Sequence, residues 1–432
     1  MPTARMQLQS PYWLGLFPLL LVLQLTFPNR VWVVLLVGLG GAWLCAFIWA
    51  RELTRNLHLV REMRFGWAQV GDRLEERFTL VNFGWVPALW VEVVDQSTLP
   101  GYQINQVRAV GSQAKNSWKT TGECTRRGLF TLGPTSLRTG DPLGLFKVEI
   151  QILGSTALMV MPPVVPLPGI DIAPGGRAGD GKRLRSNAFE RTVSASRIRK
   201  YQVSDNPRWI HWPLSIHHQE LYVRSFDSTP ASDWWIFLDL EQKTQVGQGW
   251  NTTVEHGVIL AASIADIGLR AGHSVGLVTT GEDLVWLPPK NALEQRNAIL
   301  HSLALASPGS TSLADLLETA RPSLRRGASL ILITPTVDGE WLKPLSLYVR
   351  VHLTPTVLLF DPLSYGASGD PAHTRLLLAR LGVNPYIVRR ELLDRPEAHP
   401  GHQGEWQWRV TGFGRAIPVR KPADLGWRKV GA

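Results

Sequence analysis

The chain has 432 residues, 44% of them hydrophobic, and a formal net charge of +10 from 45 basic and 35 acidic residues. This length exceeds what one core usually holds, so two or three structural units are expected. The positive charge suits a cytoplasmic surface near anionic lipid, and it would also suit nucleic acid. Only two cysteines occur, and Cys45 lies inside an apolar run, which excludes a disulfide-rich scaffold.

Two apolar runs open the chain. Residues 12–27 are apolar apart from Gln24 and Thr26, and residues 31–50 contain no charged side chain. About twenty such residues cross a bilayer as a helix, and the tripeptide Pro28-Asn29-Arg30 breaks the chain between the runs. A secretory signal peptide is the competing interpretation of the first run, but a second run follows at once and no small-residue cleavage site is evident. We therefore predict a transmembrane helical hairpin.

The basic residues around this hairpin predict its orientation. Arg5 precedes the first run, the connecting loop has only Arg30, and the second run is followed by Arg51, Arg55, Arg61 and Arg64. Because positive charge stays on the cytoplasmic side, both ends should face the cytoplasm. We expect a multi-pass protein of the inner (cytoplasmic) membrane or another cell membrane, with its soluble domains in the cytoplasm.

Composition divides the rest of the chain into further segments. Residues 1–64 would hold the two helices and a basic juxtamembrane segment, and residues 65–162 show short β-branched segments punctuated by Gly and Pro. That spacing is typical of a small β-sandwich-like domain. Residues 163–198 form a Gly- and Pro-rich basic linker, which lacks the Gly-Lys-Ser/Thr ending of a phosphate-binding P-loop. Residues 396–432 form a basic aromatic tail.

Strand and helix patterns alternate over residues 199–395. Apolar runs at 234–240 and 330–334 have the composition of central strands, and Thr252 with Glu255 forms a capping box that opens a helix. We predict an α/β domain with a mostly parallel sheet and helices on both faces. Segments 221–227 and 234–240 are expected to pair with each other.

A stretch rich in charged and aromatic residues joins the linker to this domain. Its candidate site residues are Arg199, Tyr201, Asp205, Arg208, Trp212, Arg224 and Asp227. Each arginine can hold a carboxylate through two parallel hydrogen bonds. Two interpretations stay open, a buried ion-pair network at a domain corner and an exposed docking site. A hydrolase built on Asp205 and His211 is a third, although no nucleophile elbow is visible.

This stretch resembles the signature of the bacterial family of unknown function numbered fifty-eight. The matching residues are Arg199, Tyr201, Asp205, Arg208, Ile210, Trp212, Arg224 and Phe226. Ser204 stands where the family usually has Gly, and Asp227 where it usually has Glu. A second block, from Arg127-Gly128 to Asp141-Pro142-Leu143-Gly144-Leu145-Phe146, resembles the family's Asp-Pro-Phe-Gly-Leu-Phe segment. The resemblance extends over roughly residues 10 to 390.

The resemblance implies a von Willebrand factor A-like domain. Such domains often bind a divalent cation through an Asp-x-Ser-x-Ser loop, a Thr and a further Asp. Here Asp239 is kept and Thr311 remains in a later loop, but Glu241 and Lys243 replace both serines and Pro335 follows a strand without an Asp. Magnesium needs near-octahedral oxygen ligation, so we predict a degenerate site at Asp239, Glu241 and Thr311 that binds no metal.

The resemblance also implies a partner, an AAA ATPase of the MoxR type, in complex assembly or envelope maintenance. We expect a membrane-anchored interaction module, not an enzyme, with no cofactor and with lipid contacts through its two helices. The alternatives are a membrane-bound hydrolase that uses the Asp205/His211 region, and a lipid- or nucleic-acid-binding module that uses the basic excess; of these ligands, nucleic acid is not expected.

Overall fold

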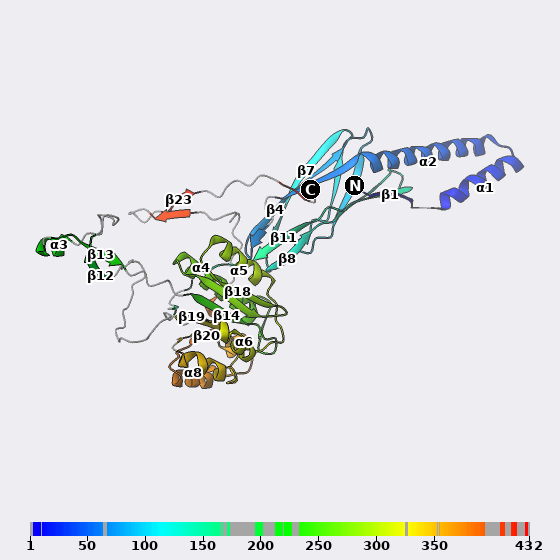
Figure 1. Ribbon diagram of the computed structural model, residues 1–432. Coiled ribbons are helices and arrows are strands. Elements are labelled where there is room, and N and C mark those ends of the chain that lie inside the picture. Colours follow the sequence, from blue (N-terminus) through cyan, green and yellow to red (C-terminus); the bar gives the residue numbers. More distant parts are fainter. Residues whose placement is uncertain are drawn as a thin grey trace. The chain divides into compact units, whose positions relative to one another are not determined.

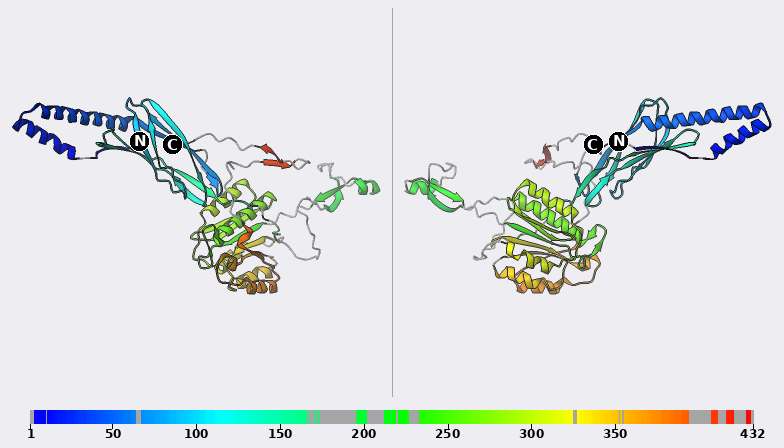
Figure 2. Two further views of the ribbon diagram at one scale, coloured as in Figure 1. Left: turned by 180° about the vertical axis from the view of Figure 1, so that it is seen from behind. Right: turned by 45° about the vertical axis from the view of Figure 1, so that its right-hand side comes forward.

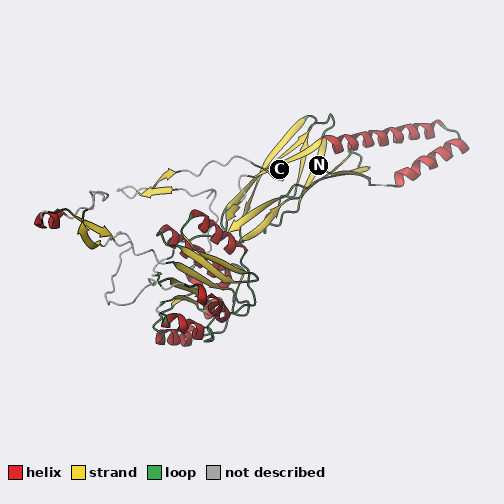
Figure 3. Ribbon diagram, in the orientation of Figure 1, coloured by secondary structure: helices red, strands yellow, loops and turns green. Residues whose placement is uncertain are grey.

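The computed structural model describes residues 3–9, 11–63, 67–165, 195–201, 212–218, 220–226, 233–324, 327–351, 355–393, 407–410, 416–420 and 428–430, with positions 167, 170, 172 and 353. The chain divides into two compact units. The β unit comprises Met1–Pro163, Leu303–Leu305 and Arg395–Ala432, and the α/β unit comprises Val164–Ser302 and Ala306–Asp394. Strands dominate the first unit, and helices alternate with strands in the second (Figure 3).

Two apolar helices, α1 (Tyr12–Thr26) and α2 (Arg30–Asn56), lie side by side at one end of the β unit (Figure 1). Asn29 caps α2, because its side chain accepts a hydrogen bond from the amide of Val31 at 3.0 Å. Among the described residues, α2 alone is long and apolar enough to cross a membrane, and α1 has 15 residues.

The second half of α2 packs against the β unit. Ala46, Ala50 and Leu53 are buried, and the rings of Trp43 and Phe47 lie 5.7 and 5.9 Å from the ring of Phe146. The helix then continues directly into strand β2, so the apolar helices are fixed to the domain that follows them.

The β unit is a sandwich of mostly antiparallel sheets, in which β3 runs parallel to β11. One sheet has the order β1-β10-β9-β5-β6, a second β24-β2-β4-β7 and a third β3-β11-β8. Alternate residues of β4 are buried, as expected for a strand with one face in a core, and Phe78 stacks on Trp118 of β7 at 5.6 Å. The strands are β1 (Thr3–Leu8), β2 (Leu57–Met63), β3 (Trp67–Gln69), β4 (Arg73–Asn82), β5 (Ala88–Asp95), β6 (Gln106–Val110), β7 (Ala114–Glu123), β8 (Gly128–Leu132), β9 (Thr135–Gly140), β10 (Phe146–Ile152), β11 (Thr156–Met161) and β24 (Arg428–Lys429).

These sheets extend beyond the expected range 65–162. Strand β1 pairs with β10, β2 pairs with β4, and β24 near the end of the chain pairs with β2. Arg61, expected in a basic juxtamembrane segment, is instead a buried residue of β2. Its charge is satisfied inside the sandwich, so it does not form part of a solvated basic cluster.

The α/β unit is built on a six-stranded sheet with the order β18-β17-β14-β19-β20-β21. The central strand β14 (Trp234–Asp239) runs parallel to β17 and β19, and β18 is an antiparallel edge strand. The other strands are β17 (Val275–Thr280), β18 (Leu284–Lys290), β19 (Ser329–Thr334), β20 (Thr356–Phe360) and β21 (Tyr386–Val388).

Helices cover both faces of this sheet (Figure 2). Trp235 and Phe237 of β14 belong to one core with α6, α7 and α8, while Leu238 faces α4 at Gly257. The helices are α4 (Thr253–Arg270), α5 (Leu293–Leu305), α6 (Leu313–Ala320), α7 (Leu342–Arg350) and α8 (Pro371–Arg380), with short turns η2 (Arg321–Ser323), η3 (Pro362–Tyr365) and η4 (Arg390–Leu392). A mixed α/β architecture is therefore confirmed.

The capping box at the start of α4 was read correctly from the sequence. Thr252 caps α4 by accepting a hydrogen bond from the amide of Glu255 at 3.1 Å, and Asp370 caps α8 before Pro371. The pairing of 221–227 with 234–240 was wrong, because β13 (Tyr222–Phe226) pairs with β12 (Ala195–Lys200). Residues 212–218 form the short helix α3 (Trp212–His218). Two further pairs of short strands are β15 (Gly247–Gln248) with β16 (Asn251–Thr252), and β22 (Gln407–Val410) with β23 (Ala416–Arg420).

Candidate functional site

The candidate site lies where the order of the parallel strands reverses. From β14, the chain moves to β17 on one side of the sheet and later to β19 on the other side. In open α/β sheets, ligands bind outside the carboxyl ends of the strands at such a switch point. Asp239 is the last residue of β14 and Thr334 the last of β19, so both lie at this edge.

Asp239 is the centre of a closed hydrogen-bond network. Its Oδ2 accepts from the hydroxyl groups of Thr334 at 2.6 Å and Thr336 at 2.7 Å, and its Oδ1 accepts from the amide of Glu241 at 3.0 Å. The amide of Thr336 in turn donates to the hydroxyl oxygen of Thr334 at 2.9 Å. This network ties the end of β14 to the end of β19.

Burial dominates the electrostatics of this carboxyl group. Asp239 is 1% exposed, and removal from water raises its pKa, while the hydrogen bonds from Thr334, Thr336 and the amide of Glu241 act in the opposite direction. The hydroxyl donors Thr334 and Thr336 offset part of the cost of burying this carboxyl group. The arrangement fixes the loops that begin at Glu241 and at Pro335.

A second loop is held beside the first. Glu241 and Gly309 form an isolated parallel bridge, in which the amide of Gln242 donates to the carbonyl of Gly309 at 2.8 Å. A Cβ at Gly309 would lie 1.9 Å from the carbonyl oxygen of Gly281, so only glycine fits there. Thr311 of this loop is exposed, and the hydroxyl donors to Asp239 come from Thr334 and Thr336.

The exposed part of this edge is acidic, although the whole chain is basic. Burial raises the pKa of Glu241, the charges of Asp239, Asp338 and Asp315 raise it further, and Lys243 opposes them. We call the following set the acidic edge: Glu241, Glu282, Asp283, Asp315, Asp338 and Glu340. Glu241, Glu282, Asp283, Asp338 and Glu340 come shortly after the carboxyl ends of β14, β17 and β19, and Asp315 lies at the start of α6, after the loop that contains Gly309. These residues therefore lie at the same edge of the sheet.

The residues present fit a divalent cation poorly. The oxygens of Asp239 already accept three hydrogen bonds, and Lys243 lies two residues after Glu241. Within the described part of the chain, no group of three or more His, Cys, Asp or Glu side chains could hold a metal ion. Sequence reasoning missed Thr334 and Thr336, for which the signal was a Thr-Pro-Thr sequence at the end of an apolar strand.

The charged stretch predicted at residues 199–227 is described in part. Asp205, Arg208 and Asp227 lie outside the described residues, as does His211 of the hydrolase alternative. The paired-network prediction therefore stays a prediction.

The remaining members of this stretch belong to a strand pair and a short helix. Arg199 lies in β12 opposite Val223, and Arg224 lies in β13 opposite Ile198. The amide of Tyr201 donates to the carbonyl of Leu221 at 2.8 Å, and Trp212 begins α3 with 59% of its surface exposed.

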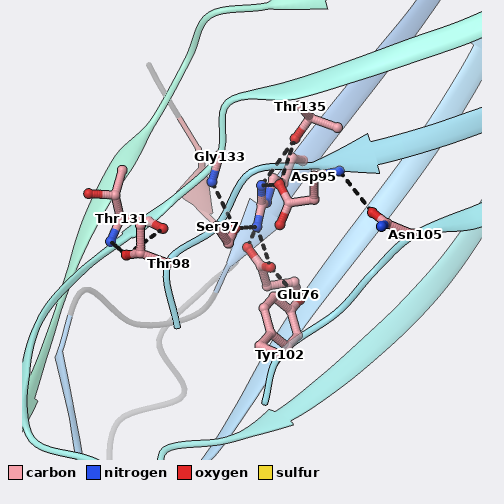
Figure 4. A network of polar contacts seen from close by, with 10 residues as sticks. Glu76, Asp95, Ser97, Thr98, Tyr102, Asn105, Thr131, Gly133 and Thr135 are labelled. Carbon is pink, nitrogen blue, oxygen red and sulfur yellow. Dashed lines mark hydrogen bonds and ion pairs between the residues drawn. The ribbon is translucent and has the colours of Figure 1, made fainter. Parts of the chain in front are cut away.

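A buried polar cluster that sequence reasoning missed lies inside the β unit (Figure 4). Arg61 donates to both carboxylate oxygens of Glu76, at 2.8 and 2.7 Å, and to Asp95 at 2.7 Å. Its remaining hydrogen bonds go to the hydroxyl groups of Thr135 and Ser97, both at 3.1 Å. These partners come from β4, β5, β9 and the segment after β5, so one guanidinium joins the two main sheets.

The cluster satisfies its charges internally. Burial acts to lower the pKa of Arg61, but the carboxylates of Glu76 and Asp95 outweigh it and the pKa is raised. Tyr102 donates its hydroxyl proton to Glu76, and burial followed by the charge of Glu76 raises the pKa of this phenol. Every one of these groups is used in a contact within the sandwich, so the cluster has a structural role.

Comparison with known proteins identifies one segment of the chain. Residues 197–365 match the family model described as "Protein of unknown function DUF58". No curated protein matches.

Solved structures resemble parts of the chain weakly. The SpRpn10 VWA domain is 10% identical, with 39% of this chain and 98% of that chain covered and a TM-score of 0.26. The CARDB domain of the PF1109 protein from Pyrococcus furiosus, in complex with di-metal ions, is 10% identical, with 24% and 90% covered and a TM-score of 0.18.

Proposed function

Because residues 197–365 belong to the DUF58 family, whose function is unknown, we propose a role from the site itself. The chain is a membrane-anchored protein-interaction module, and the acidic edge of its α/β unit binds a basic surface of a protein partner. We propose an AAA ATPase of the MoxR type as that partner, in complex assembly or envelope maintenance, and a von Willebrand factor A-like layout for the unit.

The observation that carries this proposal is the closed network around Asp239. Three donors hold the carboxyl group of Asp239, and it is 1% exposed, so it supports the surrounding loops instead of reacting with a substrate. Loops held rigidly present their exposed carboxylates in a fixed pattern, which lowers the ordering cost of binding. Complementary charge across an interface then steers association and sets specificity.

The apolar helices support the membrane part of the proposal. Helix α2 has the length and composition of a spanning helix, and α1 lies beside it as the second half of a hairpin. Arg51 and Arg55 follow the apolar run directly and are exposed. By the positive-inside rule, both soluble units then face the cytoplasm, where an AAA ATPase would meet them.

The test is partner capture from solubilised membranes with the full chain as bait. The double substitution Glu241→Lys and Asp338→Lys reverses charge on the acidic edge, and it should abolish capture of the MoxR-type ATPase. The matched control is Glu294→Lys, an exposed acid at the start of α5, at the opposite edge of the sheet. Equal capture by both variants would refute the proposed surface.

The hydrolase alternative makes a different prediction. Hydrolysis should depend on Asp205 or His211 and should be insensitive to charge on the acidic edge. If the chain instead binds lipid or nucleic acid through its basic residues, its affinity for that ligand should fall steeply as salt is added. Assays of the same variants separate these possibilities from partner capture.

A further inference from the structure

We propose that the end of the β unit next to α2 is embedded in the membrane interface, so that lipid headgroups and upper acyl chains cover it. This surface, the membrane rim, consists of the side chains of Phe83, Trp85, Leu89, Trp90 and Leu143. The inference rests on the proposed membrane anchoring and adds the depth at which the soluble part begins.

Helix α1 is shorter than the hydrocarbon core of a bilayer. Its 15 residues correspond to about 22 Å of helix, whereas the hydrocarbon core of a bilayer is about 30 Å thick. The chain cannot supply more helix on the near side, since the amide of Gln9 still donates to the carbonyl of Leu145 in the β unit. A hairpin this short spans the core only if the β unit itself reaches the bilayer.

Helix α2 independently indicates the same depth. From Arg30 to Trp43, where ring contact with Phe146 begins, the helix covers about 20 Å. The charge-free part of α2 nevertheless continues to Ala50, which lies about 30 Å from Arg30 and directly before Arg51. The hydrophobic span therefore extends past the level at which the β unit starts to pack on the helix.

The membrane rim begins at this level with Leu143 and extends to the last turn of α2, where Phe83 lies. The amide of Phe83 donates to the carbonyl of Asn56 at the end of α2, and a Cβ at Gly84 would lie 3.2 Å from the carboxylate of Glu52. The turn that carries Leu143 leads directly into Phe146, which packs on α2. All five rim side chains are between 40% and 65% exposed.

Local backbone features turn these side chains outward. The register of β5 against β6 shifts between Ala88 and Val91, and this bulge leaves both Leu89 and Trp90 exposed. Bulges commonly redirect side chains in this way. In the next turn, the carboxylate of Asp141 accepts hydrogen bonds from the amides of Leu143 and Phe146, which holds Leu143 at the tip.

Lipid is the occupant that fits this surface. Aromatic side chains concentrate at the boundary between hydrocarbon and headgroups, and arginines interact with the headgroup phosphates. Arg51 and Arg55 are exposed just beyond the charge-free part of α2, next to the aromatic rim. The rim continues the apolar surface of the hairpin, so the same bilayer covers both.

The experiment measures depth with a fluorescent label on single cysteines in the full chain, reconstituted in nanodiscs of mixed phosphatidylcholine and phosphatidylglycerol. Cys45→Ser removes the exposed native thiol, and Cys124 is buried. Labels at Trp85→Cys and Leu143→Cys should show blue-shifted emission and quenching by lipids with a doxyl group near the headgroup. The matched control is Leu129→Cys, an exposed apolar position in β8 at the other end of the unit (Figure 1), which should show neither.

A label at Val22→Cys in α1 distinguishes a wrong assignment of the membrane rim from a wrong assignment of the membrane anchor. Quenching at position 22 without quenching at 85 and 143 would overturn the membrane rim and leave the anchor intact. Absence of quenching at position 22 would overturn the membrane anchor itself. Equal quenching at 129 and at the rim positions would also contradict the inference, because the whole unit would then lie on lipid.

Discussion

Arg61 and Glu76 form two parallel hydrogen bonds, at 2.8 and 2.7 Å, between the neighbouring strands β2 and β4. Both side chains are buried, and a second carboxylate, that of Asp95, contacts the same guanidinium. The positive charge thus offsets two negative charges in a region from which water is excluded. Replacing only one of the two charged side chains is costly, because the other charge then stays buried without a partner.

Arg61→Met should therefore destabilise the β unit strongly. Loss of one partner from a buried pair typically costs about 3–5 kcal/mol, which corresponds to roughly a hundredfold or greater loss of amide protection in β2 and β4. Hydrogen exchange of the full chain in detergent measures this protection. The control is Arg77→Met, which removes the partly exposed pair with Glu62 and should cost about 1 kcal/mol or less. Similar protection in both variants would contradict the structural role of the cluster.

The sequence predicted local elements well because their signals are local. The apolar strand that ends at Thr334 and the capping pair Thr252 and Glu255 both depend on neighbouring residues. Strand β13 was assigned the wrong partner because a strand pattern does not specify its neighbour in the sheet.

The polar clusters could not be predicted from local patterns. Asp239 and Thr334 are 95 positions apart, and Arg61 and Asp95 are 34 apart. In the sequence, Arg61 was one of several arginines after an apolar run, and the positive-inside rule treats such residues as solvated. The pairing of β2 with β4 places Arg61 inside the sandwich, where its side chain contacts the buried Glu76.

The stability of the α/β unit should fall in mild acid because of His256. This side chain is fully buried, its Nδ1 lies 2.6 Å from the hydroxyl oxygen of Tyr365, and burial, with Arg390, lowers its pKa to about 4. Between that pKa and the unfolded value of about 6.5, the unfolded chain binds the extra proton, so stability is lost as pH falls through this window. The loss approaches about 3 kcal/mol near pH 4.

Urea unfolding followed by pulse proteolysis, at about pH 7.5 and about pH 5, measures this dependence on the full chain. In His256→Gln, which keeps a polar partner for Tyr365 but does not titrate, the difference between the two pH values should shrink. Tyr365→Phe is the control, since it removes the hydrogen bond and retains the imidazole. An unchanged pH dependence in His256→Gln would assign the effect to other groups.

The orientation of the chain predicts protection from external protease. With Arg5 before the first helix and Arg51 and Arg55 after the second, the proposed topology puts both soluble units in the cytoplasm. Protease added to intact cells should leave both units undigested, and permeabilised cells should show rapid cleavage. Digestion of either unit from outside would reverse the proposed topology.

The site at the end of β14 should bind magnesium weakly or not at all. A cation at Asp239 would have to displace the hydroxyl donors of Thr334 and Thr336, and Lys243 would place a positive charge close by. Magnesium also loses its water shell reluctantly and requires several well-placed oxygens. Calorimetry on the full chain in detergent should show no binding heat below the millimolar range. Saturable heat that disappears in Asp239→Asn would establish a metal site there and would show that the threonine hydroxyls can turn to ligate it.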